Sequence, residues 1–241
     1  MNSEIRDLQP KEVWNKFADL NAVPRPSKKE EQVIAFMLEF GKKLNLETFK
    51  DEVGNVIIKK PATAGMENRK AVVLQSHLDM VHQKNNDTTF DFSSQGIEMF
   101  VENGWVKAKG TTLGADNGLG VAAIMAVLES NNIAHPAIEA LFTIDEETGM
   151  TGAQGLKGGV LNGEILLNLD TEEDDEIDIG CAGGVDVTAT RKYQEEETPE
   201  RVTAYKISVK GLQGGHSGMD IHRGLGNANK IMNRLLFDGF E

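Results

Sequence analysis

Acidic side chains and one histidine follow four apolar runs of this sequence. The residues that share this position are His77, Asp79, Asp116, Glu146, Glu147 and Asp170. Three of the runs, at 72–76, 138–144 and 165–169, are predicted to be buried strands, and side chains at strand ends line the usual crevice of an α/β sheet. Carboxylates gathered there would repel one another unless cations neutralised them. A pair of divalent metal ions and metal-assisted hydrolysis are the simplest interpretation.

His77 and Asp79 are two positions apart, so on a strand they point to the same side. The Asp79 carboxylate could then hydrogen-bond the ring nitrogen of His77 that does not hold metal, which fixes the tautomer and raises ligand basicity. The pattern His-x-Asp is common among surface histidines, so it gains weight only from the other acidic segments.

Glu146 and Glu147 are adjacent and would face opposite ways on an extended backbone. Where the chain turns at a strand end, both could reach one cavity, one holding metal and the other accepting a proton from water. A solvated acidic turn before Gly149 is the alternative. The three other acidic segments favour the site.

Periodicity predicts the elements that position these residues. Residues 11–22 have the spacing of a helix, which Pro24 and Pro26 end, and Ser27 with Glu30 is predicted to form a capping box for the next helix. Two strands are expected around Gly54-Asn55. A helix should begin at Gly118, so that Asp116 lies just ahead of its N-terminus, where a carboxylate is stabilised. The pattern is that of an α/β protein.

Composition excludes several classes of protein. The 241 residues carry 38 acidic against 25 basic side chains, a formal net charge of -13, with no basic stripe, so we expect no nucleic-acid partner. No stretch reaches the ~18 apolar residues of a membrane span. The single cysteine, Cys181, excludes an intramolecular disulfide and is interpreted as a packed thiol. Together with a polar N-terminus, these features predict a cytoplasmic protein.

The residue pattern of the sequence changes near residue 187. Alternating apolar residues predict a strand at 205–209, a glycine-rich turn surrounds His216, and a helix is expected after it. A catalytic role and a structural turn are equally open for His216 on local grounds. We expect residues 1–187 to form one domain and residues 188–241 to be the beginning of a second, truncated domain, because one strand and one helix cannot close a core.

The order of the motifs resembles that of a known family. His-x-Asp at 77–79, Gly-Ala-Asp-Asn-Gly at 114–118, Asp-Glu-Glu-Thr-Gly at 145–149 and the strand-ending Asp170 are similar to the M20 family of co-catalytic zinc peptidases and deacylases. Within it, the chain most resembles the aminoacyl-histidine dipeptidase group. The resemblance implies a zinc-peptidase-like catalytic domain with a mixed central sheet flanked by helices, followed by the start of an α+β lid and dimerisation domain.

The resemblance also implies a role for each residue. His77 and Asp170 would bind one zinc ion, Glu147 would bind the second, and Asp116 would bridge both across a cis peptide bond to Asn117. Glu146 would be the general base and Asp79 would orient His77. His216 would reach the site from the lid, often from the partner subunit of a homodimer, and stabilise the oxyanion.

One ligand of this family has no match here. The second zinc ion also needs a histidine near the end of a chain about twice this length, so we expect this sequence to be the N-terminal half of a longer protein. The predicted function is hydrolysis of dipeptides, Xaa-His and broader, by a zinc-bound water, with Co or Mn as alternative metals. An amide deacylase of the same family or a non-catalytic metal-binding fragment are the alternatives.

Overall fold

The computed structural model describes residues 3–171, 175–180, 183, 185, 187–215 and 220–239. The chain divides into two units, Met1–Asp178 and Ile179–Glu241. His216 and Cys181, singled out by the sequence, lie outside the described residues. The predicted domain boundary at residue 187 stays a prediction. Each of the two units is described by itself.

A five-stranded mixed sheet forms the centre of the first unit, in the order β1-β2-β6-β3-β7. The strands are β1 (Glu47–Lys50), β2 (Val56–Lys60), β3 (Val72–His77), β6 (Ile138–Thr143) and β7 (Ile165–Asn168). β3 is parallel to both β6 and β7, whereas β2 is antiparallel to its neighbours β1 and β6. The predicted fold class, an α/β domain with a mixed sheet flanked by helices, is confirmed.

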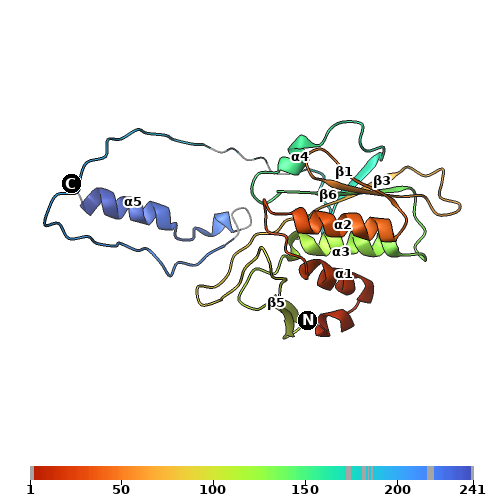
Figure 1. Ribbon diagram of the computed structural model, residues 1–241, viewed down its shortest axis with the longest axis horizontal. Helices are drawn as coiled ribbons and strands as arrows, with labels where there is room; N and C mark the ends of the chain where they lie inside the picture. The colour runs from red at the N-terminus through yellow and green to blue at the C-terminus, as the bar shows by residue number, and fades with distance from the viewer. Residues whose placement is uncertain are drawn as a thin grey trace. The chain divides into compact units, whose positions relative to one another are not determined.

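Two helices cover one face of this sheet (Figure 1). α2 (Glu31–Lys43) and α3 (Ala115–Glu129) contribute Val33, Met37, Val121 and Ile124 to a core that also contains Ile58 and Phe142 of the strands. α1 (Lys11–Asn21) packs on α3 from the outside, after a short 3-10 helix at Glu4–Asp7. Apolar residues at helical spacing thus produce the predicted layers.

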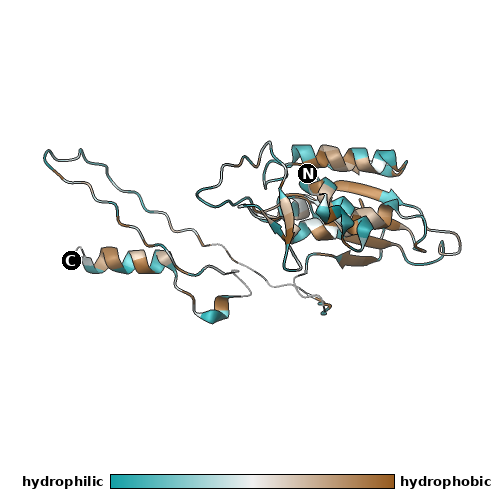
Figure 2. Ribbon diagram, turned by 90° about the horizontal axis from the view of Figure 1, so that it is seen from below, coloured by the Kyte–Doolittle hydropathy of each residue, from teal (hydrophilic) through white to brown (hydrophobic). Residues whose placement is uncertain are grey.

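The other face of the sheet has a smaller cluster. Ile57, Val73 and Leu141 are buried there against Leu156, Val160 and Leu161, which follow the short helix α4 (Thr151–Gly155). All six residues of β6 are buried, as expected of a strand covered on both faces. Figure 2 shows this sheet mostly in the hydrophobic colour.

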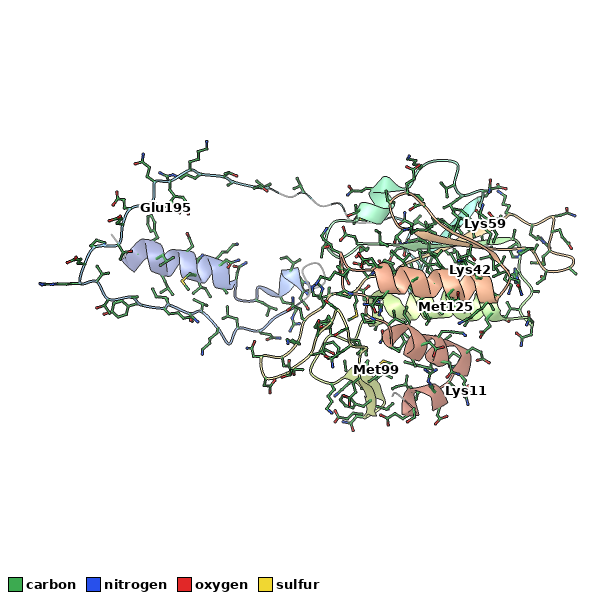
Figure 3. The ribbon with its side chains drawn as sticks, in the orientation of Figure 1. Lys11, Lys42, Lys59, Met99, Met125 and Glu195 are labelled. Carbon is green, nitrogen blue, oxygen red and sulfur yellow. The ribbon has the colours of Figure 1, made fainter. Side chains whose placement is uncertain are left out.

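A hairpin that the periodicity did not predict lies beside α1. β4 (Met99–Glu102) and β5 (Trp105–Ala108) are joined by Asn103-Gly104, both with positive φ, the signature of a two-residue hairpin turn. Met99 packs with Phe17 and Ile5 in a cluster separate from the main core, to which Met125 belongs (Figure 3). The Asn-Gly pair was the signal for this element.

Three sequence expectations for these elements are wrong. The Ser27 side chain does not cap α2, because its hydroxyl donates to the Asp79 carboxylate instead. The strand predicted as buried at 165–169 is exposed, because it forms β7 (Ile165–Asn168), the edge of the sheet in the first unit. Residues 205–209 form no strand, since in the described part of the second unit no neighbouring strand pairs with them.

The described second unit contains two helical segments. These are η2 (Ile221–Arg223) and α5 (Ala228–Gly239), and α5 confirms the helix predicted after the glycine-rich turn. Its residues alternate between the two hydropathy colours in Figure 2, as expected of an amphipathic helix. Among the described residues, no helix combines the length and apolarity needed to cross a membrane.

Candidate metal and catalytic site

Strand register brings three of the predicted segments to one edge of the sheet. His77 pairs with Thr143 across the parallel strands β3 and β6, so residues 77–79 and 145–147 leave the sheet side by side. β7 runs parallel to the other side of β3 and ends at Asn168, two residues before Asp170. The carboxyl ends of parallel strands therefore gather these side chains where α/β folds place their sites.

The fourth segment enters at the beginning of α3. Asp116 and Asn117 have non-helical backbone angles within the first turn, and the peptide bond between them is cis, as the resemblance predicted. The Asn117 side chain accepts a hydrogen bond from Ser76 (2.8 Å) and donates one to the carbonyl of Leu169 (3.1 Å). One amide thus ties the start of α3 to β3 and to the segment that carries Asp170.

The predicted ligands and the predicted base come together around the His77 ring. Its Nε2 atom lies 2.9 Å from Oδ1 of Asp116 and 3.8 Å from carboxylate oxygens of both Glu146 and Asp170. Among the described residues, three groups of possible ligand atoms each lie within 4.8 Å of one another, and two of these groups contain His77. The two are His77 with Glu146 and Asp170, and His77 with Asp116 and Glu147. Each of these two groups combines one imidazole with two carboxylates, a combination that suits zinc.

Asp79 lies behind His77 and is fully buried. Its Oδ1 atom is 3.3 Å from Nδ1 of His77, and its carboxylate accepts the backbone N–H groups of Glu146 (3.0 Å) and Glu147 (3.3 Å) and the hydroxyl of Ser27 (2.8 Å). Burial alone would raise the pKa of Asp79, but these donors outweigh it and lower the pKa to about 2. Asp79 is therefore a fixed negative charge.

The other acidic side chains of the site lie close to one another, and their negative charges repel. Burial raises the pKa of Glu146, Glu147 and Asp170, and nearby carboxylates raise each of them further. The hydrogen bond to His77 lowers the pKa of Asp116. For His77, burial opposes the proton, but the hydrogen bonds to Asp116 and Asp79 outweigh it and raise the pKa to about 10. Several carboxylates around one imidazole favour a bound cation, so the donor set fits divalent metal ions.

Sequence reasoning missed the layer beneath these residues. Asp145 has positive φ (51°) and is held by Lys28, Thr148 and Thr151. One oxygen of Glu30 accepts the backbone N–H groups of Lys28 (2.9 Å) and Asp145 (3.1 Å). The segment at 27–30, read from the sequence as a helix cap, is thus the floor of the site. Nothing in its residue types signals this.

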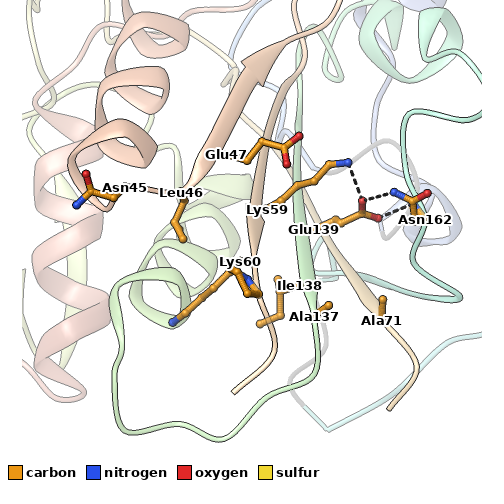
Figure 4. A pocket seen from close by; sticks show the side chains of 11 residues that line it. Asn45, Leu46, Glu47, Lys59, Lys60, Ala71, Ala137, Ile138, Glu139 and Asn162 are labelled. Carbon is orange, nitrogen blue, oxygen red and sulfur yellow. Dashed lines mark hydrogen bonds and ion pairs between the residues drawn. The ribbon is translucent and has the colours of Figure 1, made fainter. Parts of the chain in front are cut away.

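A separate hollow of about 310 Å³ lies at the opposite ends of the strands (Figure 4). It is lined by residues at the starts of β3 and β6 and the end of β2, among them Ala71, Ile138 and Lys60. The Glu139 carboxylate beside it accepts hydrogen bonds from the backbone N–H groups of Asn162 and Gly163 and pairs with Lys59. These contacts are structural, and the hollow is not part of the candidate site.

Comparison with known proteins shows the family to which the chain belongs. A sequence profile of the peptidase family M20/M25/M40 matches residues 73–216. The cytosol non-specific dipeptidase of Escherichia coli (strain K12) is 50% identical over 234 residues, which cover 97% of this chain and 48% of that protein. The chain therefore belongs to the M20/M25/M40 peptidase family.

Solved structures give the same result. An aminoacylhistidine dipeptidase from Vibrio alginolyticus superposes with a TM-score of 0.75 at 47% identity, covering 97% of this chain and 48% of the other. An aminopeptidase PepT from Bacillus cereus superposes with a TM-score of 0.59 at 25% identity, covering 69% of this chain and 44% of the other. The chain spans about half the length of the relatives it matches.

Proposed function

We propose that this chain carries the metal-binding and general-base residues of a metal-dependent dipeptidase. The observation that carries the proposal is the contact of one histidine ring with carboxylates from three other segments, at the carboxyl edge of the sheet. The two relatives at 50% and 47% identity are named as dipeptidases, which supports peptide hydrolysis. The first of them is a cytosol dipeptidase, which supports the predicted cytoplasmic location.

His77 and Asp170 would hold one ion, Glu147 the second, and Asp116 would lie between them. Zinc is the metal we propose, because one imidazole with several carboxylates is a set that it accepts. When bound, such ions lower the pKa of a water molecule and polarise the scissile carbonyl. The family resemblance implies one further ligand for the second ion besides the residues named here.

Glu146 is the proposed general base. Its carboxylate is 3.8 Å from His77, and its pKa is raised by burial and by neighbouring negative charges, which favours a group that takes up a proton and gives it back. Glu146 would remove a proton from the attacking water and deliver it to the leaving amine. Asp79 would fix the His77 ring, and His216 would donate to the oxyanion, from the partner subunit if the whole protein is a homodimer.

Glu146→Ala tests the base. In the whole protein that the gene encodes, we expect zinc binding to persist while kcat for an aminoacyl-histidine dipeptide falls by about 10²- to 10⁴-fold. Glu102→Ala is the matched control, since this carboxylate lies on the exposed hairpin and pairs only with Lys107 among the described residues. Retained turnover in the Glu146 variant would contradict the assignment.

A substrate panel separates the alternatives. Zinc-dependent cleavage of dipeptides, abolished by a chelator, supports the dipeptidase. Turnover of N-acyl amino acids without dipeptide cleavage would mark an amide deacylase, which needs the same residues. Zinc binding without turnover of either class by the whole protein would leave a metal-binding protein and overturn the catalytic proposal.

A further inference from the structure

Arg25 is a buried cation directly beneath the candidate metal site. Only 1% of its surface is exposed, and its guanidinium donates hydrogen bonds to the carbonyls of Leu78 (3.1 Å), Asp79 (3.3 Å) and Gly114 (2.5 Å). A fourth goes to the side-chain oxygen of Asn21 (2.9 Å). A planar guanidinium can serve several oxygens at fixed angles, which an ammonium group cannot do.

The carbonyls that Arg25 binds belong to the two segments that carry the central ligands. Leu78 and Asp79 follow His77 directly, and Gly114 is two residues before Asp116. His77 and Asp116 themselves are 2.9 Å apart. One side chain therefore joins the backbone at the end of β3 to the backbone ahead of α3.

Asn21 extends the same connection. Its amide donates to the carbonyl of Leu113 (3.0 Å) while its oxygen accepts from Arg25 (2.9 Å). Asn21 is the last residue of α1 and is fully buried. The end of α1 is thereby bonded to the loop that leads to Asp116.

The glycines of the 114–118 segment provide a second, independent observation. A Cβ atom added at Gly114 or Gly118 would lie 2.5 or 2.6 Å from the Nη2 atom of Arg25. Real Cβ atoms essentially never approach so closely. Both positions must therefore lack a side chain for the guanidinium to occupy its place, so the backbone around Asp116 is shaped to receive Arg25.

The positive charge of Arg25 lies close to the negative charges of the candidate site. Burial lowers its pKa to about 10, against the opposing effect of Asp79, Asp116 and Glu147, so the group stays protonated at neutral pH. These are three of the carboxylates that surround His77. The chain thus keeps one permanent positive charge under a cluster of negative ones.

We propose that Arg25, braced by Asn21, is a positioning residue that fixes the segment of His77 against the segment of Asp116 and so sets the spacing of the metal ligands. Its meaning for catalysis depends on the metal-dependent function proposed above. The effect on the backbone does not depend on that function.

The test compares Arg25→Lys and Arg25→Met with Arg6→Lys in the whole protein. Arg6 is the matched control, because it pairs with Asp19 on the surface and is 36% exposed. Loss of residues that orient metal ligands typically costs about 10- to 100-fold in metal affinity or activity. We expect a loss of that size in zinc affinity, measured by chelator competition, and in kcat, with KM changed by less than about threefold because substrate contacts remain.

Hydrogen exchange of the metal-free protein gives the readout that is independent of the proposed function. In both Arg25 variants, faster exchange should be confined to backbone amides at 77–81 and 113–119, and Arg6→Lys should show none. If the parent protein binds no zinc, the proposed function fails, while the exchange pattern still decides the role of Arg25.

Folded Arg25 variants with parental exchange, zinc affinity and kcat would overturn the proposal, and so would a uniform rise in exchange across the unit. Should both variants fail to unfold cooperatively, Gly118→Ala decides, since it keeps Arg25 but places a Cβ atom 2.6 Å from the guanidinium, as well as 2.9 Å from the Phe17 ring. It should reproduce the localised exchange, and parental behaviour in that variant would overturn the proposal.

Discussion

The backbone N–H of Glu146 donates a 3.0 Å hydrogen bond to Oδ1 of Asp79, the same oxygen that lies 3.3 Å from the His77 ring. The carboxylate that orients the proposed ligand therefore also fixes the turn that carries the proposed base. Because the two segments leave adjacent parallel strands, this one side chain sets the position of the ligand relative to the base.

Asp79→Asn should therefore damage the ligand and the base together. An amide accepts through one oxygen only, so it cannot both accept the N–H groups of Glu146 and Glu147 and carry the charge that favours His77. We expect zinc affinity and kcat/KM to fall by about 10- to 100-fold. The free energy of unfolding should fall by about 1–3 kcal/mol, because buried donors lose their acceptor.

Asp91→Asn is the control for this substitution. Asp91 also accepts hydrogen bonds from a backbone N–H and a hydroxyl, those of Ser93 and Ser94, but on the exposed surface. Chelator competition, steady-state kinetics and denaturant unfolding check both variants. Unchanged zinc affinity in Asp79→Asn would contradict the orienting role.

Much of this fold could be predicted from residue patterns, and the site's clustering followed from it. Apolar periodicity placed α1, β3, β6 and α3, because each buries one face or both in the apolar clusters of the first unit. The exposure of β7 could not be predicted, because Ile165, Leu166 and Leu167 have the composition of a buried strand. Whether a strand is central or at an edge depends on partners that lie elsewhere in the chain.

The supporting residues of the site were hidden for a different reason. The residue types of His77 and the carboxylates indicate metal binding. The contribution of Arg25, Ser27 and Glu30 is to hold other groups of the site by hydrogen bonds. Their roles depend on which backbone groups the fold brings near them. Residue type alone cannot show this.

Metal binding is expected to weaken as the pH falls. Without metal, the proposed ligand His77 has a pKa raised to about 10, and the proposed ligands Glu147 and Asp170 also have raised pKa values. A ligand must lose its proton to bind, so each proton released makes the affinity rise by about tenfold per pH unit. Titration calorimetry in buffers of different ionisation enthalpy, between pH 5.5 and 7.5, counts the protons, and a pH-independent affinity would contradict this picture.

Glu139→Gln should reduce the acid sensitivity of folding. The carboxylate is 5% exposed; burial alone would raise its pKa, but the N–H groups of Asn162 and Gly163 outweigh burial and lower it. A lowered pKa in the folded state gives stability that is present above the unfolded pKa and is lost as the pH falls through the folded value. At pH 7 the free energy of unfolding of the variant should be about 1–3 kcal/mol lower than that of the parent. Between pH 5 and 3 the free energy of unfolding should decrease less in the variant than in the parent.

Glu164→Gln is the matched control, because Glu164 forms an exposed ion pair with Lys70. It should leave the pH dependence of unfolding close to that of the parent. Urea unfolding at several pH values makes the comparison. Parallel curves for the Glu139 variant and the parent would contradict the expectation. They would show that the folded and the unfolded state bind the same number of protons at this position.

Gly120→Ala tests the contact that ties α3 to the sheet. A Cβ atom there would lie 2.0 Å from the Asn117 side-chain oxygen and 2.5 Å from the Ser76 hydroxyl oxygen, which hydrogen-bond each other. Alanine is favoured over glycine in a helix by about 1 kcal/mol. Overpacking costs about 1–3 kcal/mol, and the lost hydrogen bond adds to it, so we expect net destabilisation with weaker zinc binding.

Gly158→Ala is the matched control, because no atom lies within 4 Å of the Cβ atom that it would add. It should change neither the free energy of unfolding nor the zinc affinity. A Gly120→Ala variant that is more stable than the parent and binds zinc equally well would show that Asn117 does not position Asp116.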